Sequence, residues 1–277
     1  MLSEFYVLYI LAFIFGSILG SFLNVCIYRL PKNISIINPL SHCTSCKKPI
    51  KFYNNIPILS FILLGGSCKN CGSNFSPIYL IVEILAGLIT VFLVWRFGLT
   101  LQTLFYLIFL LSLVVITFID IEYMIIPNVI TIPGIIIGII YGALRTDWTN
   151  LWNILNTTNF NPTIITSYIS EVPVFDSLFG AIFGGGLLFL IGVVYQIIRK
   201  REGMGMGDVK LLSMIGAFLG WKAVIFVALF SSLIGTFVGL AIIIYKKGDL
   251  KYAIPFGPFL SLAAVFYLFT GGFSLHL

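Results

Sequence analysis

Two aspartates stand where long apolar runs end or begin, and each could take part in acid–base chemistry. Asp120 closes the run in VVITFIDIEYMIIPN, and Asp208 opens another in GMGMGDVKLL. Two carboxyls held close together cannot both ionise cheaply, so one keeps a proton while the other stays charged. Such a pair could deprotonate a water for attack on a peptide carbonyl and protonate the leaving amine.

Each aspartate also has a plainer interpretation. Asp208 could be an N-cap that accepts hydrogen bonds from the first free amides of a helix, and Asp120 could be a solvated residue where a span meets water. Gly205 and Gly207 favour a site, because glycine lets another segment approach the helix start closely. Lys210 could fix local orientation or simply extend its charge into water.

Four cysteines form two C-x-x-C pairs with 21 residues between them; these are Cys43 and Cys46, then Cys68 and Cys71. The spacing predicts a tetrahedral zinc site, and four sulfur ligands leave no open position, so the zinc would be structural. Two disulfides are the alternative, but they rarely persist in the cytoplasm, where we place this loop. Zinc would supply folding energy that a short polar loop cannot obtain from its own core.

Long apolar segments must position these groups. The chain is 59% hydrophobic and 9% charged, which indicates a membrane protein. Because lipid cannot hydrogen-bond the backbone and strand-like alternation is missing, we predict an all-α polytopic fold. About eight transmembrane helices are expected, at residues 5–28, 78–97, 101–120, 128–145, 177–198, 209–220, 222–245 and 255–272. The sixth is short for a full crossing.

The basic residues predict the orientation of these spans. Of 16 Lys and Arg residues, only Arg96, Arg145 and Lys222 fall on the side opposite the loop 29–77. The positive-inside rule therefore places the cysteine loop in the cytoplasm and the N terminus outside. Both aspartates then lie at cytoplasmic helix ends. The net charge of +6 does not predict nucleic-acid binding, since no basic cluster lies on a soluble fold.

Two further segments carry structural expectations. Residues 146–176 are rich in Asn and Thr with few charges, and we expect an interfacial loop with an amphipathic helix. The cluster GAIFGGG at 180–186 predicts close helix packing.

Several motifs together resemble one family. They are GSFLNVCIYRLP, the paired cysteines, SPIYLIVEILAG, DIEYMIIPN, GMGMGDVKLL and PFGPFL, in this order along nearly the whole chain. This set is similar to the type IV prepilin peptidases, membrane aspartic proteases of the GxGD class. The resemblance implies that Asp120 and Asp208 cleave the basic leader of prepilins or pseudopilins at the cytoplasmic face of the bacterial inner membrane.

The resemblance also implies a second reaction. Many members methylate the new N-terminal residue with S-adenosylmethionine, so methylation and this cofactor are expected from the resemblance alone. No glycine-rich dinucleotide fingerprint is present to identify a cofactor site. The expected domains are a first span at 1–30, a cytoplasmic tetra-cysteine zinc-binding domain at 31–77 and a membrane-embedded peptidase domain at 78–277.

A third carboxyl, Glu83, lies well inside the second span, so it must be paired, protonated or turned toward a polar cavity. We predict that it helps to hold the substrate or the methyl-transfer region, with Asn24 and Arg29 as partners from the first span. The alternative is an interhelical hydrogen bond that only locks the bundle.

Two other classes of protein compete with the peptidase. A proton- or cation-coupled transporter would place its acids near the bilayer centre and show repeated halves. A zinc-containing membrane scaffold without catalysis would use Asp208 only as a cap.

Overall fold

The computed structural model describes residues 2–38, 41–43, 45–50, 56–149, 172–200, 205–246 and 254–270. Within these residues the chain forms helices and loops, with isolated bridges and no strand. In the part of the chain that the structure describes, six helices are long and apolar enough to cross a membrane, which confirms the prediction of an all-α polytopic membrane protein. The chain divides into two compact units, Met1–Tyr123 and Met124–Leu277.

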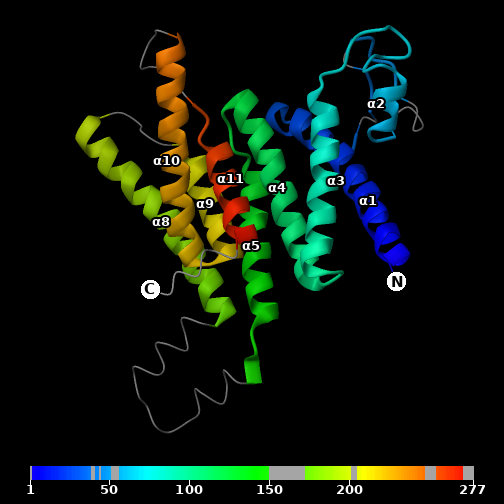
Figure 1. Cartoon of the computed structure of the whole chain (residues 1–277). Coiled ribbons are helices and arrows are strands. Elements are labelled where there is room, and N and C mark those ends of the chain that lie inside the picture. The colour runs from blue at the N-terminus through cyan, green and yellow to red at the C-terminus, as the bar shows by residue number, and fades with distance from the viewer. Residues whose placement is uncertain are drawn as a thin grey trace, which may run out of the picture. The chain divides into compact units, whose positions relative to one another are not determined.

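The first unit contains three long helices and the segment with the four paired cysteines, residues 31–77, called the cysteine segment below (Figure 1). Its elements are α1 (Leu2–Arg29), η1 (Leu30–Lys32), α2 (Leu59–Leu63), α3 (Ile78–Phe97) and α4 (Leu101–Tyr123). Helix α1 packs against α3 and α4, and α3 packs against α4. The chain reverses between α3 and α4 at Gly98, whose φ of 68° suits glycine.

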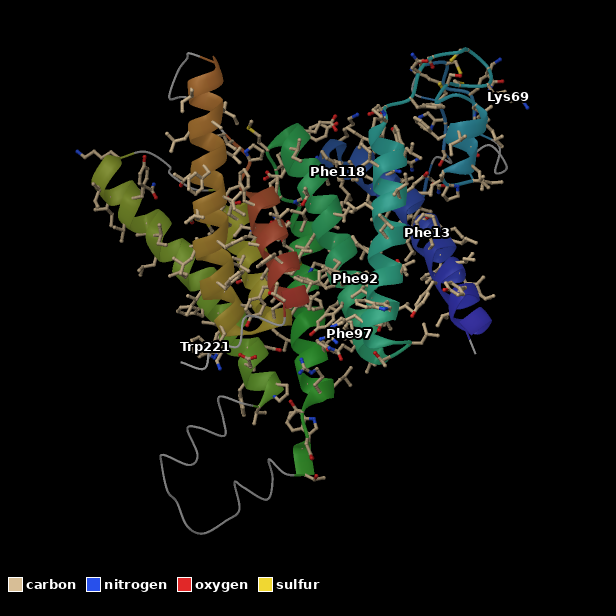
Figure 2. The ribbon with its side chains drawn as sticks, in the orientation of Figure 1. Phe13, Lys69, Phe92, Phe97, Phe118 and Trp221 are labelled. Atoms are coloured by element: carbon tan, nitrogen blue, oxygen red, sulfur yellow. The ribbon has the colours of Figure 1, made fainter. Side chains whose placement is uncertain are left out.

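Small residues bring α1 and α3 together. Gly16 and Gly20 lie one turn apart on α1, and a Cβ on Gly20 would come within 2.7 Å of the Cα of Glu83. From the other side, a Cβ on Gly87 of α3 would come within 2.7 Å of the ring of Phe13, which Figure 2 labels on α1. This is the close approach that a small-xxx-small pattern permits between membrane helices.

The second unit is built around a short helix. Its elements are α5 (Asn128–Arg145), α8 (Pro173–Arg199), α9 (Met206–Leu219), α10 (Trp221–Lys246) and α11 (Gly257–Thr270). Helix α9 packs against α5, α8, α10 and α11 (Figure 1). Its central residues have no exposed surface; they are Leu211, Leu212, Met214, Ile215 and Ala217. A helix that is apolar on every side is one enclosed by other helices.

Helices α8 and α9 approach each other through glycine. A Cβ on Gly180 of α8 would collide with the carbonyl oxygen of Gly216 on α9, and a Cβ on Gly216 would collide with the carbonyl oxygen of Gly180. A Cβ on Gly184 would likewise meet the carbonyl oxygen of Leu212. The close packing predicted from GAIFGGG is therefore confirmed.

A carboxylate holds the turn between α9 and α10. Gly220 ends α9 with φ 82°, and α10 begins at the next residue. Asp176, in the first turn of α8, accepts a hydrogen bond from the backbone N–H of Trp221 at 3.2 Å. Figure 2 labels this tryptophan. Asp176 therefore has a structural role as a cap for the start of α10.

The predicted spans and the observed helices agree to within a few residues at each end, and two of the helices are short. Helices α9 and α11 have 14 residues each, or about 21 Å, which is shorter than a bilayer core of about 30 Å. The predicted interfacial helix falls largely on residues 150–171, which lie outside the described residues, as do Gly203, Arg201, Lys247 and Lys251. The domain limits at 30/31 and 77/78 remain predictions.

Candidate active site and metal centre

The two C-x-x-C motifs adopt the same backbone turn. The amide of Cys43 donates to the carbonyl five residues later at 3.0 Å, and the amide four residues later donates back to Cys43 at 2.9 Å. Cys68 repeats both bonds at 2.9 and 2.8 Å. The fourth residue after the first cysteine of each motif has a positive φ, which is 57° at Lys47 and 68° at Gly72. Each turn therefore directs its two sulfurs to the same side.

The four sulfur atoms form a compact cluster. The Sγ atoms of Cys43, Cys46, Cys68 and Cys71 all lie within 4.8 Å of one another, and those of Cys43 and Cys71 are 3.8 Å apart. A tetrahedron of Zn–S bonds of about 2.3 Å has S···S edges of about 3.8 Å. All four cysteines are free thiols, so the disulfide alternative is wrong. The cluster can hold a metal ion.

The thiols differ in acidity. The backbone N–H of Cys46 and the hydroxyl of Ser73 lower the pKa of Cys43 to about 6. For Cys46, a backbone hydrogen bond from Lys48 is outweighed by burial and by the neighbouring sulfurs, which raise the pKa to about 11. Four thiolates at this separation repel one another, so a cation at their centre is needed for all four to ionise.

Asp120 lies in the last turn of α4. Its side chain is 5% exposed, and Ile116 and Ile119 beside it have no exposed surface. The interpretation of Asp120 as a solvated residue is therefore wrong. The helix ends three residues later at Tyr123, because Met124 takes a left-handed φ of 55°.

Asp208 lies in the first turn of α9 and is partly exposed. The N-cap of this helix is Gly205, and its backbone carbonyl accepts a hydrogen bond from the amide of Asp208 at 3.1 Å. The interpretation of Asp208 as the N-cap is therefore wrong. A Cβ on Gly205 would lie 3.4 Å from Oδ2 of Asp208, so the carboxylate is directed back toward the helix start.

The start of α9 is fastened to the start of α5 within the second unit. A Cβ on Gly207 would come within 2.8 Å of the Cβ of Ile126, so only glycine fits here without a shift. Lys210 Nζ donates to Asn128 Oδ1 at 2.8 Å. Lys210 therefore has a specific partner on α5. Asp120 belongs to the first unit and Asp208 to the second, so a meeting of the two carboxyls stays a prediction.

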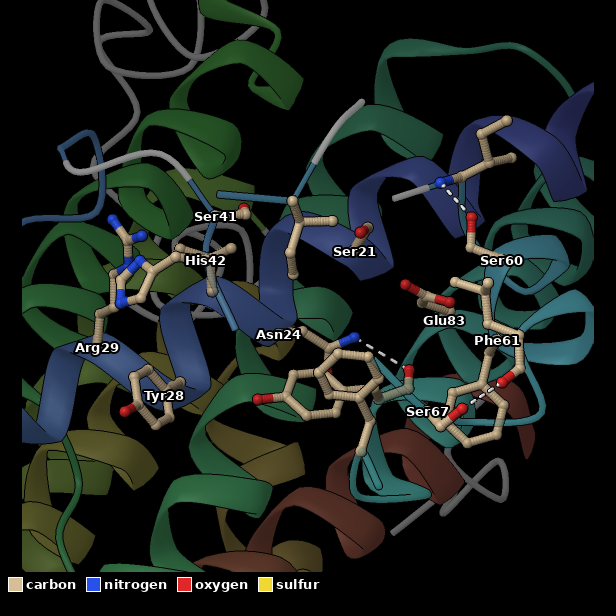
Figure 3. A pocket seen from close by; sticks show the side chains of 16 residues that line it. Ser21, Asn24, Tyr28, Arg29, Ser41, His42, Ser60, Phe61, Ser67 and Glu83 are labelled. Carbon is tan, nitrogen blue, oxygen red and sulfur yellow. Dashed lines mark hydrogen bonds between the residues drawn. The ribbon is translucent and has the colours of Figure 1, made fainter. Parts of the chain in front are cut away.

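Asn24, Arg29 and Glu83 all line one pocket of the first unit, drawn in Figure 3. Asn24 donates to the carbonyl of Tyr79 at 3.0 Å, and Arg29 donates to the carbonyl of Ser35 at 2.8 Å. Glu83 accepts from the backbone amide of Ile58 at 2.8 Å. Glu83 thus joins α3 to the cysteine segment.

Some residues of these sites gave no signal in the sequence. Ser73 lies 3.1 Å from the sulfur of Cys71 and 3.6 Å from that of Cys43, but an isolated serine after a C-x-x-C motif is unremarkable. Tyr28 and Tyr79 line the pocket, and tyrosine is common near membrane interfaces. Only the fold brings them together.

Comparison with known proteins identifies the family. A model of the bacterial peptidase A24 N-terminal domain matches residues 14–97, and a model of the type IV leader peptidase family matches residues 107–240. A prepilin leader peptidase/N-methyltransferase of Aeromonas salmonicida is 32% identical over 286 residues, covering 94% of this chain and 90% of that protein. The chain belongs to the type IV leader peptidase family.

Other relatives carry the same name. One from Pseudomonas putida is 30% identical, covering 91% of this chain and 87% of that protein, and one from Pseudomonas aeruginosa is 29% identical, covering 92% and 88%. No solved structure matches the chain significantly. Membership of a leader peptidase family, together with the apolar helices, identifies a multi-pass inner-membrane protein with protease activity. It does not support the transporter or scaffold alternatives.

Proposed function

We propose that this protein cleaves the basic leader of type IV prepilins or pseudopilins, with Asp120 and Asp208 as its catalytic pair. The observation that carries this proposal is the close contact of Gly207, the residue before Asp208, with Ile126. That residue follows Asp120 by six positions, so the covalent chain limits its distance from Asp120 to about 21 Å. The leader peptidase family gives the reaction class.

The proposed chemistry needs one protonated and one ionised carboxyl. The ionised carboxylate takes a proton from water as its oxygen forms a bond to the scissile carbonyl carbon. The protonated carboxyl first stabilises the developing oxyanion and then gives its proton to the leaving nitrogen as the C–N bond breaks. Burial of Asp120 keeps competing water from its carboxyl, which strengthens such interactions.

The proposed orientation has the N terminus outside and both aspartates at the cytoplasmic face. Its support is the distribution of Lys and Arg between the sides of the predicted spans. Cleavage on this side would remove a leader whose basic residues stay in the cytoplasm.

We further propose that the four-cysteine cluster holds a structural zinc ion. Its support is the S···S distance of 3.8 Å between Cys43 and Cys71 and the compactness of the whole cluster. Four sulfur ligands leave no position for water or substrate, so the zinc would stabilise the loop rather than react.

N-methylation of the new N terminus is the second proposed activity, and its support is the name of the relatives. When bound, S-adenosylmethionine supplies a methyl group: the amine nitrogen bonds to the methyl carbon, the C–S bond breaks to leave a neutral thioether, and a proton leaves the amine.

The catalytic pair can be tested with purified full-length protein in detergent and a prepilin substrate. Asp120→Asn and Asp208→Asn should each lower the leader-cleavage rate by about 100-fold or more, because acid–base catalysis needs both carboxyls. Asp147→Asn is the matched control, since its carboxylate is exposed and accepts hydrogen bonds from the backbone N–H and the hydroxyl of Thr149. Wild-type cleavage by either catalytic variant would falsify the pairing.

A further inference from the structure

Helix α9, which carries Asp208, is joined to α8 by hydrogen bonds at two levels. Near the middle of α9, the hydroxyl of Ser213 donates to the backbone carbonyl of Ala181 at 2.6 Å. Just beyond its end, the backbone N–H of Trp221 donates to Oδ1 of Asp176 at 3.2 Å; Figure 2 labels this tryptophan. Both acceptors belong to α8.

Glycine makes room for both hydrogen bonds. A Cβ on Gly185 of α8 would come within 2.5 Å of the hydroxyl oxygen of Ser213, and a Cβ on Gly220 would collide with the carboxylate of Asp176. Gly220 also has a φ of 82°, which a residue with a side chain rarely adopts. The backbone is therefore shaped so that these two polar side chains reach their partners.

The hydrogen bonds restrict α9 in a way that its glycine contacts do not. The contact of Gly180 with Gly216 sets how closely the two helices approach, but van der Waals contact has little directional preference. A hydrogen bond is directional. Two of them, at residues 213 and 221, therefore oppose both sliding of α9 along α8 and rotation about its own axis.

Helix α5 completes a set of links within the second unit. The backbone N–H of Val174, in the first turn of α8, donates to Oγ1 of Thr146 at the end of α5, at 3.1 Å. Lys210 joins the start of α9 to Asn128 at the start of α5. Each pair among α5, α8 and α9 is thus connected by a side-chain hydrogen bond.

We propose that Asp176 and Ser213 are positioning residues for Asp208, because they fix the depth and rotation of the helix that carries its carboxylate. Asp208 precedes Ser213 by five residues in one continuous helix, which is about 7.5 Å along the axis. A slide or rotation of α9 at Ser213 therefore moves the carboxylate as well. The inference rests on the proposed cleavage reaction, to which it adds two residues that act through α9.

Steady-state cleavage of a prepilin by full-length protein in detergent tests the inference. Asp176→Ala and Ser213→Ala should each lower kcat by about 10-fold or more, since misplacing a catalytic group by about 1 Å can cost about 100-fold. KM should stay near the wild-type value, because the lost alignment matters in the transition state. Wild-type kcat in both variants would overturn the inference.

A conservative variant separates the hydrogen bond from the charge. Asp176→Asn keeps an oxygen that can accept from the N–H of Trp221, and it should restore most of kcat. A loss as large as that of Asp176→Ala would overturn the proposed role of this hydrogen bond. Ser213→Ala removes one hydroxyl at a half-buried position, so the test does not depend on Asp176→Ala folding.

Two control variants distinguish positioning from general loss of stability. Ser232→Ala also removes a hydroxyl, but that hydroxyl bonds to Ala228 within α10, at 2.7 Å, so kcat should be unchanged. Phe230→Ala removes a ring that stacks on Phe226 and Phe266 and should lower the melting temperature while kcat stays near wild type. If Phe230→Ala lowered kcat as much as Ser213→Ala for the same loss of melting temperature, the positioning role would be refuted.

Hydrogen exchange gives a readout that needs no substrate. Mass spectrometry of peptides from the first two turns of α9 should show faster exchange in Asp176→Ala and Ser213→Ala than in wild type. Unchanged exchange there, despite a lower kcat, would contradict the inference. If exchange rose as expected but Asp208→Asn cleaved like wild type, the catalytic pair would be wrong and the anchoring of α9 would stand, so the two failures are distinguishable.

Discussion

Gly205 and Gly207, which precede Asp208, have different surroundings. A Cβ on Gly207 would meet Ile126 at 2.8 Å, whereas the nearest atom to a Cβ on Gly205 would be Oδ2 of Asp208 at 3.4 Å, an ordinary contact. Packing therefore requires glycine at position 207, whereas at position 205 a Cβ would fit beside the carboxylate of Asp208.

This difference gives a prediction for stability. Gly207→Ala should lower the free energy of unfolding by about 1–3 kcal/mol, the usual cost of overpacking, because Ile126 must move. Gly205→Ala should lower it much less. Thermal unfolding in detergent measures both variants, and equal melting temperatures would show that the Ile126 contact is unimportant.

Lys210 provides a second prediction at this scale. If its bond to Asn128 orients the start of α9, Lys210→Met and Asn128→Ala should not be additive, with a coupling energy of up to about 1 kcal/mol for an exposed pair. A double-mutant cycle on unfolding free energy measures it. Full additivity would mean that Lys210 only extends its charge into water.

Two glycines of helix α8, Gly180 and Gly186, differ in how closely other atoms approach them. Gly180→Ala would collide with the backbone of Gly216 and should separate α8 from α9, whereas a Cβ on Gly186 meets nothing within 4 Å. We expect Gly180→Ala to lower the melting temperature by several degrees and to impair cleavage. Gly186→Ala should be neutral or slightly stabilising, since alanine favours helix. The reverse order would mean that the α8–α9 crossing is not limited by glycine.

The cysteine segment is the element in which metal content can be measured. Cys43→Ser should lose bound zinc, as determined by elemental analysis, and should make the segment from residue 31 to 77 more sensitive to proteolysis. Cys26→Ser is the control, because Cys26 is buried in α1 and lies outside the cluster. Retention of one zinc per chain by Cys43→Ser would exclude this cluster as the site.

For the whole molecule, orientation is the property to test. Alkaline phosphatase, active only outside the cytoplasm, should be active when fused after Gly98 or Thr146. Green fluorescent protein should fluoresce after Lys32 or Lys200. The opposite pattern would place the proposed active site outside and remove its access to a cytoplasmic leader.

The sequence predicted this molecule well where a single helix is concerned. The span predicted at 128–145 agrees with Asn128–Arg145, because length and apolar composition alone determine it. Contacts between helices were harder. The spacing of Gly16 and Gly20 indicates a packing face but not the helix that it contacts, and no feature of the local sequence indicates the approach of Ile126 to Gly207. The pocket around Glu83 likewise needs three elements to be placed before its lining is apparent.

The enclosure of α9 has a consequence for how this protein is made. A helix of 14 residues with an acidic first turn is a weak stop for the translocon, and one glycine separates it from the longer α10. We therefore expect the two to enter the membrane as a hairpin, so that the buried centre of α9 is fully enclosed only after the ribosome has completed α10 and α11.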